Sequence, residues 1–132
     1  MSDAMLVLQA AAVSALNAHP VLGDVLTGIY DGPPPRAAFP YIAINDGFTT
    51  DWSTKTATGR EVRLALTLWD DGEEPTRLSS LMGHAEDAMA AVARDLPGWR
   101  IAGIVFLRSM LVRDPSGPWA GIVEHRVRML AT

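Results

Sequence analysis

One stretch near the middle of the chain constrains the fold most strongly: Glu61-Val-Arg-Leu-Ala-Leu-Thr-Leu-Trp69. Every second residue from Val62 to Leu68 is apolar, and the residues between them are mixed in character. A period of two is typical of a strand with one buried face. Burying four such side chains contributes roughly 6–12 kcal/mol to folding. We therefore expect a central strand of a sheet here, and we expect a lysine in place of Leu66 to unfold the domain.

Composition narrows the class of protein. At 132 residues the chain fits a single domain spanning 1–132. With 48% hydrophobic and 20% charged residues it is typical of a globular protein, and no apolar run reaches the length that a membrane helix needs. It has no cysteine and no recognisable secretory signal at its start, so we expect synthesis in the cytoplasm. A net charge of −4 argues against a general nucleic-acid binder.

The first third of the chain predicts a helix and two strands. Residues 3–18 carry apolar side chains at helical spacing, and the helix should stop at His19-Pro20 because the residue before a proline avoids the helical region. Ile29-Tyr30 can form a brief strand before a proline-rich turn, and Phe39 to Asn45 a second one. His19 itself is expected to interact with the last carbonyls of the helix.

The segment 47–59 differs in character, with five threonines, two glycines and one tryptophan in no regular period. We expect a long mobile loop, or alternatively a hairpin arm, between the second strand and the strand at 61–69. Loops of this length inside a compact domain are usually functional or disordered.

The second half predicts a helix and a hairpin. An acidic turn at 70–74 precedes a helix from Pro75 to Leu96. Ile101 to Val112 is apolar on both faces, as in a strand covered on both sides, and Trp119 to Leu130 returns beside it. The expected fold is α+β: a largely antiparallel sheet of four to five strands, two helices packed on it, and a C-terminal β-hairpin. The uncovered apolar face of the 101–112 strand needs either the curl of the sheet or, as we prefer, another subunit.

No residue pattern indicates catalysis, a cofactor or a metal. His84, Glu86 and Asp87 are close in sequence, but there is no second histidine one helical turn away. His125 lies among the apolar residues of the last strand, where a hydrogen-bonded structural role is expected. Neither a serine nucleophile motif nor a glycine-rich phosphate loop is present in the sequence. We expect a protein that is not an enzyme.

Two tryptophans in polar surroundings are the candidate interaction residues. Trp52 lies in the 47–59 segment and Trp119 follows the hairpin turn. Tryptophan is enriched among interface anchors, although each ring can equally fold back over its own domain. Lys55 and Arg60 beside Trp52 can pair with an acidic partner or remain solvated charges.

The order of these features resembles the tail-terminator or tail-completion proteins of long-tailed bacteriophages and gene transfer agents. The features are an alanine-rich first helix, His19-Pro20, Ile29-Tyr30-Asp31, Phe39-Pro40-Tyr41-Ile42, Leu68-Trp69-Asp70, the long helix, Leu96-Pro97-Gly98-Trp99, and Glu124-His125-Arg126-Val127. Asp70 departs from the pattern, in which a serine is expected, and leaves the local turn open.

The resemblance implies a structural virion protein without cofactors. Such a protein forms a six-membered ring, caps the tail tube, ends tube elongation, and joins the tail to the head connector or stopper protein. It assembles in the host bacterial cytoplasm and then lies at the head-proximal end of the tail. DNA passes through the ring without specific binding. Six chains at −4 favour an acidic lumen, unless Arg60, Arg108 or Arg113 lines it.

Three alternatives to a tail terminator remain. The first is a head-completion or stopper protein of the same particle. A tail-tube protein would assemble into long tubes instead of one ring. A small α+β enzyme or ligand-binding domain would use His125, with Glu124 or Asp87, to frame a pocket.

Overall fold

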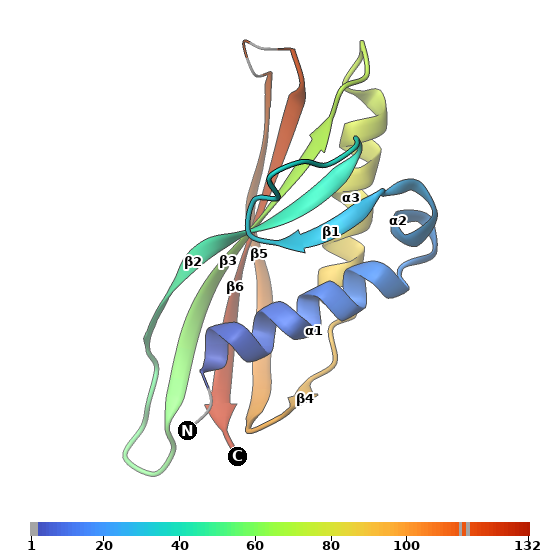
Figure 1. The fold of residues 1–132 in the computed structure, drawn as a ribbon. Coiled ribbons are helices and arrows are strands. Elements are labelled where there is room, and N and C mark those ends of the chain that lie inside the picture. The colour runs from blue at the N-terminus through green and yellow to red at the C-terminus, as the bar shows by residue number, and fades with distance from the viewer. Residues whose placement is uncertain (1–2, 114, 116) are drawn as a thin grey trace.

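The computed structural model describes residues 3–113, 115 and 117–132. Within them the chain forms one six-stranded sheet in the order β1-β2-β3-β6-β5-β4, with three helices (Figure 1). The predicted α+β class is confirmed. The brief strand expected at Ile29-Tyr30 is the edge strand β1 (Gly28–Asp31), and the strand count of four to five was low because the two-residue strand β4 (Asp95–Leu96) at the other edge lies where the end of the long helix was predicted.

The first helix, α1 (Ala4–Ala18), begins where expected. Asp3 caps it, since its Oδ1 accepts a 2.9 Å hydrogen bond from the backbone N–H of Met5. The helix ends at His19, and a second short helix, α2 (Pro20–Val25), follows at once. His19 interacts with the end of α1 as predicted, but through its backbone N–H, which donates a 3.3 Å hydrogen bond to the carbonyl of Leu16, and its side chain does not make that bond. Instead, Nδ1 accepts hydrogen bonds from the N–H groups of Val21 and Leu22 and caps α2.

The long helix is shorter than predicted. Helix α3 runs from Thr76 to Ala90, with Pro75 at its N-cap. The apolar spacing continues to Val92, which is buried, but the chain has already left the helix. Leu96 belongs to β4, which pairs with the start of the next strand.

The sheet is antiparallel except at one edge, and four long strands make up most of it. They are β2 (Tyr41–Asp51), β3 (Gly59–Asp70), β5 (Trp99–Arg113) and β6 (Trp119–Ala131). The exception is β1, which pairs parallel to β2. As expected, β5 and β6 form the C-terminal hairpin, and β3 lies at the centre between β2 and β6.

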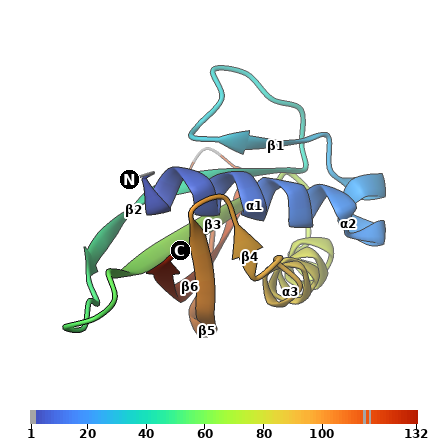
Figure 2. The ribbon, with the colours of Figure 1, turned by 90° about the horizontal axis from the view of Figure 1, so that it is seen from below.

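A single core lies between one face of the sheet and the helices α1 and α3. Its sheet residues include all four alternating apolar residues of β3, and its helix residues include Leu8, Leu16, Leu78 and Met89. Figure 2 shows α1 crossing the strands and α3 at the far end of the molecule from the β2–β3 hairpin. The opposite side of the sheet, which we call the outer face, carries the intervening residues of each strand, such as Ala65 of β3 and Glu124 of β6.

The 47–59 segment forms the hairpin arm that was the alternative to a loop. Strand β2 continues to Asp51 and β3 begins at Gly59, while a shift in register between Asn45 and Phe48 bends β2 at the base of the arm. The turn is closed by a 2.9 Å hydrogen bond from the N–H of Trp52 to the carbonyl of Gly59. Its mobility stays a prediction.

No helix among the described residues is both long and apolar enough to cross a lipid bilayer.

Candidate assembly surface

Strand β5 carries the largest concentration of exposed apolar side chains. Five residues of this strand are between 38% and 47% exposed: Val105, Phe106, Met110, Leu111 and Val112. On one side β5 pairs with β6 along its length, whereas on the other β4 reaches only Trp99 and Arg100. An open, apolar strand edge favours association with another strand. The prediction that this strand needs more cover than its own helices is therefore consistent with the fold.

Two irregularities in β5 change which face each residue occupies. The pairing with β6 shifts between Ile101 and Gly103 and again between Phe106 and Arg108. Each shift inserts one unpaired residue, so the side chains of β5 do not simply alternate between the two faces along the whole strand. Phe106 pairs with His125 and faces the helices, whereas Met110 pairs with Ile122 and faces outward.

The outer face carries a row of charged residues. Arg108 binds Glu124 with two hydrogen bonds of 2.9 and 3.1 Å. Glu61 accepts from Arg128 at 3.0 Å and lies 3.8 Å from Arg126. Arg63 stands over the ring of Phe48, 5.8 Å from its centroid. These pairs tie β3, β5 and β6 together, and hydrogen bonding from Arg108 lowers the pKa of Glu124 below its usual range.

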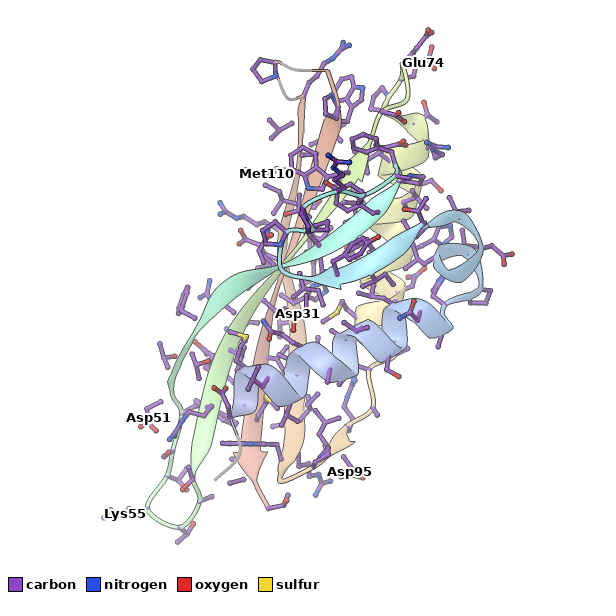
Figure 3. All side chains as sticks on the ribbon, viewed as in Figure 1. Asp31, Asp51, Lys55, Glu74, Asp95 and Met110 are labelled. Atoms are coloured by element: carbon purple, nitrogen blue, oxygen red, sulfur yellow. The ribbon has the colours of Figure 1, made fainter. Side chains whose placement is uncertain are left out.

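The arm brings together three of the four predicted interaction residues. Trp52 is half-buried, and the guanidinium of Arg128 stands 5.2 Å from its ring centroid. Arg60 forms a 3.2 Å ion pair with Asp51 across the hairpin. Lys55 is exposed at the tip of the arm (Figure 3). Trp52 therefore packs partly on its own domain, and Lys55 remains available to a partner.

The fourth predicted residue, Trp119, lies at the opposite end of the sheet. It is half-buried against the core, and Arg113 stands 5.1 Å from its ring centroid. The structure therefore does not bring Trp52 and Trp119 into one site. Near Trp119 the outer face is hollowed by about 450 Å³, and the wall includes Pro33, Tyr41, Trp69 and Ile122. The sequence did not predict this hollow because its wall combines the proline-rich turn with strand residues that are distant in the chain and come together only in the folded protein.

The enzyme alternative required a pocket around His125, and among the described residues His125 lines none of the five hollows found. His125 is buried and contacts the edge of the Phe106 ring, at a centroid distance of 5.8 Å. Glu124, the adjacent residue, points to the outer face and binds Arg108. Burial lowers the pKa of His125. Its Nδ1 has no hydrogen-bond partner among the described residues, which corrects the expectation for that atom.

Sequence analysis discounted a metal site at His84 because no second histidine lies one helical turn away, but the fold brings one from another part of the chain. His19 lies beside His84, with ring centroids 5.0 Å apart, and candidate ligand atoms of His19, His84 and Asp87 fall within 4.8 Å of one another. However, Nδ1 of His19 already accepts two backbone N–H groups. The neutral ring then carries its proton on Nε2 and has no free lone pair for a cation. His19 is therefore better suited to capping α2 than to binding a metal ion together with His84 and Asp87.

Asp70, the position that departed from the family pattern, anchors the turn into α3. Its buried carboxylate accepts a 2.8 Å hydrogen bond from Nε of Arg77 and a second from Nη2. Hydrogen bonding from Arg77, with further bonds from the backbone of Gly72 and Asp71, lowers the pKa of Asp70 despite its burial. An acidic residue here is therefore matched by an arginine in the first turn of α3.

Comparisons with known proteins agree on the fold. One solved structure, described as the virion of a native gene transfer agent particle, contains a chain that superposes with a TM-score of 0.82 at 24% identity, covering 99% of this chain and 100% of that chain. The gp17 protein of bacteriophage SPP1 superposes with a TM-score of 0.62 at 21% identity, covering 98% and 91%. At these identities the likeness concerns the fold. No curated protein sequence matched this chain.

The sequence itself matches a family model. The model is that of the tail completion protein gp17, and it matches residues 10–130. This range includes β1, β2, β3, α3 and all but the last residue of the C-terminal hairpin, together with most of α1. Because the match extends over nearly all of the chain, this protein belongs to the family of tail completion proteins represented by gp17.

Proposed function

We propose that this protein forms a ring of six copies that caps the tail tube, ends tube elongation and joins the tail to the head connector or stopper protein. The observation that carries the proposal is the open apolar edge of β5, in a member of a tail completion family. A protein that acts alone rarely leaves five large apolar side chains exposed along one strand edge. A subunit of a ring covers such an edge on assembly.

The partners of the ring are the tail tube protein on one side and the head connector on the other. Two ends of the sheet are suited to these contacts: the arm with Trp52, Lys55 and Arg60, and the hairpin turn beside Trp119. They project from opposite ends of the molecule (Figure 1). Assembly then takes place in the host bacterial cytoplasm, and the finished ring lies at the head-proximal end of the tail.

An acidic lumen remains part of the proposal. The chain has a net charge of −4, so six copies carry −24. Of the three arginines whose presence in the lumen would oppose this, Arg60 is paired with Asp51 and Arg108 with Glu124. Only Arg113, which stands over Trp119, lacks a carboxylate partner among the ion pairs of the described residues. Weak net attraction would let DNA pass without being held.

The proposal is tested by adding the protein to polymerising tail tube protein. Tube lengths measured by negative-stain electron microscopy should stop increasing, and density should appear at one end of each tube. Tubes that grow equally long with and without the protein would contradict a terminator role. Long tubes formed by this protein alone would identify it as a tube protein, and binding to the head connector without any effect on tubes would favour a head-completion or stopper role.

A further inference from the structure

The sheet has a second open edge, on the side opposite β5. Strand β1 pairs only with Tyr41 to Ile44 of β2. From Asn45 to Asp51, β2 pairs with β3 on one side, and no described strand pairs with it on the other. This stretch contains Phe48, which is 58% exposed. The two open edges therefore belong to the same sheet, one on each side.

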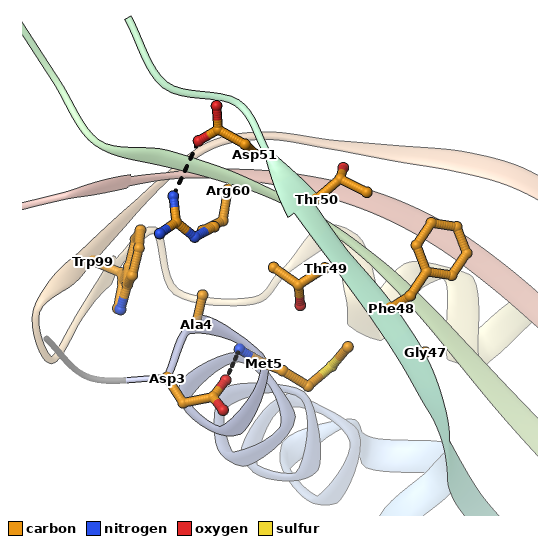
Figure 4. A pocket seen from close by; sticks show the side chains of 10 residues that line it. All are labelled: Asp3, Ala4, Met5, Gly47, Phe48, Thr49, Thr50, Asp51, Arg60 and Trp99. Carbon is orange, nitrogen blue, oxygen red and sulfur yellow. Dashed lines mark hydrogen bonds and ion pairs between the residues drawn. The ribbon is translucent and has the colours of Figure 1, made fainter.

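A hollow lies along the β2 edge. It measures about 550 Å³ and is lined by the stretch from Gly47 to Asp51, the start of α1 from Asp3 to Met5, Arg60 and Trp99 (Figure 4). The N-terminal turn of α1 forms its floor. The hollow lies on the helix-facing side of the sheet, so a strand that pairs with the unpaired edge of β2 would border it.

The exposed residues of β5 indicate what kind of partner covers them. Phe106 and Leu111 pair with His125 and Gly121 and face the helices, whereas Val105, Met110 and Val112 face outward. A helix or sheet packed on one face would cover only half of them. A strand added to the edge brings its own side chains to both faces at once. The occupant is therefore expected to be a strand.

The charges of the two edges are complementary. Strand β5 contains Arg100, Arg108 and Arg113 and no acidic residue between Trp99 and Arg113. Of the three, only Arg108 has a carboxylate partner, Glu124 of β6, among the ion pairs of the described residues. The hollow beside β2 is bordered by Asp3, Asp51 and Arg60; because Arg60 pairs with Asp51, one excess negative charge remains, at Asp3. A basic strand edge and an acidic hollow would favour each other over self-pairing of either edge.

We propose that the open edge of β5 in one copy adds to the open edge of β2, residues 45–51, in the next copy, so that the sheets join head to tail. Two copies joined in this way use one edge of each kind between them and leave one edge of each kind free. Such a contact repeats, and it closes into a ring when its rotation allows. This inference rests on the proposed ring and names the surfaces that build it.

The test uses two variants that each block one edge. Lysine on an exposed strand edge opposes strand addition because its charge would be buried. Val105→Lys with Leu111→Lys blocks β5 on both faces, and Phe48→Lys blocks β2. Val21→Lys with Val25→Lys is the matched control, because these two valines of α2 are exposed to a similar degree, 36% and 37%, and lie on neither edge. Circular dichroism and urea unfolding establish that each variant is folded.

Light scattering behind a sizing column, across a concentration series, gives the mass of each species. The wild type and the control should form the full assembly, about 85 kDa for six chains of 14.2 kDa. Each edge variant alone should remain a monomer. An equimolar mixture of the two should give a heterodimer of about 28 kDa, twice the chain mass, because one intact edge of each kind remains.

Other outcomes separate the inference from the proposed function. If the wild type assembles and either edge variant assembles equally well, the edges are not the interface, although the ring stands. If both edge variants are folded and monomeric on their own, and their equimolar mixture is also monomeric, the contact is not head to tail between these two edges. A wild type that stays monomeric throughout the series overturns the self-pairing, while the tube-length experiment independently decides the terminator role.

Discussion

Nε of Arg77, in the first turn of α3, lies 2.8 Å from Oδ2 of Asp70, the last residue of β3. The carboxylate is buried, with 1% of the side chain exposed, whereas the side chain of Arg77 is 52% exposed. This pair joins the central strand to the long helix across the acidic turn. Strand β3 is the element that is easiest to recognise in the sequence, and the pair connects it to α3, one of the helices that cover it.

Removing the charge at Asp70 should weaken the fold in a pH-dependent way. Asp70→Asn leaves the shape nearly unchanged but removes the ion pair, and we expect a loss of about 1–3 kcal/mol in the free energy of unfolding at pH 7. In the wild type the pKa of Asp70 is lowered on folding, so its contribution is complete above the unfolded pKa of about 3.9 and is lost as the pH falls through the folded value. Urea unfolding from pH 7 to pH 2 measures both effects. An unchanged pH profile in the variant would contradict the assignment.

His125 should make the protein less stable in mildly acidic solution. Burial lowers its pKa, so between the unfolded value of about 6.5 and the folded value the unfolded chain binds more protons. Stability from this group is complete above about pH 6.5 and declines as the pH falls through the folded pKa. His125→Leu fills a similar space without a titrating group and should flatten this part of the profile. Thermal unfolding at intervals between pH 7.5 and pH 5 tests it, and equal slopes for both proteins would refute the prediction.

The glycine at the base of the arm should resist substitution. A Cβ on Gly47 would lie 1.6 Å from the carbonyl oxygen of Arg63, so Gly47→Ala requires the backbone of the arm to move. We expect a loss of about 1–3 kcal/mol. Gly83 in α3 has open space around its Cβ position, and Gly83→Ala should instead stabilise the helix by about 0.5–1 kcal/mol. Urea unfolding of both variants checks the opposite signs.

Position, more than chemistry, should decide the effect of a leucine-to-lysine change. Leu66 is fully buried in the core, whereas Leu6 on α1 is 63% exposed. Leu66→Lys should prevent folding, since a charge buried without a partner costs several kcal/mol. Leu6→Lys should change stability by less than about 0.5 kcal/mol. Circular dichroism and sizing of the two purified variants make the comparison, and a folded Leu66→Lys protein would contradict the placement of β3.

The sequence predicted best those elements in which local pattern and tertiary environment agree. The alternation of β3 matches its buried face, and Asp3 begins α1 as its residue type suggests. The end of α3 was placed too late because Val92 and Leu96 continue the apolar spacing after the helix has ended. Local spacing alone cannot distinguish a core residue in a helix from one in the segment that follows it.

The assembly surface was predicted only in outline. An uncovered apolar face on the 101–112 strand was expected, but the bulges after Ile101 and Phe106 depend on pairing with β6 and left no sign in the sequence. The edge of β2 is open because β1 stops pairing with it at Ile44, and this end point depends on the tertiary structure. The contact between His19 and His84 likewise joins two helices that are distant in the chain, so only the fold reveals it.

The second bulge of β5 has a consequence for how this protein can change in evolution. The unpaired residue after Phe106 determines which face of the sheet each later side chain of β5 occupies. Deleting one residue there would therefore turn Arg108 towards the helices and Leu111 towards the outer face. Substitutions along β5 can accumulate one at a time, whereas a change of length by one residue alters every later position at once. Lineages of this protein should therefore keep the number of residues in this part of β5 more strictly than the identity of any one of them.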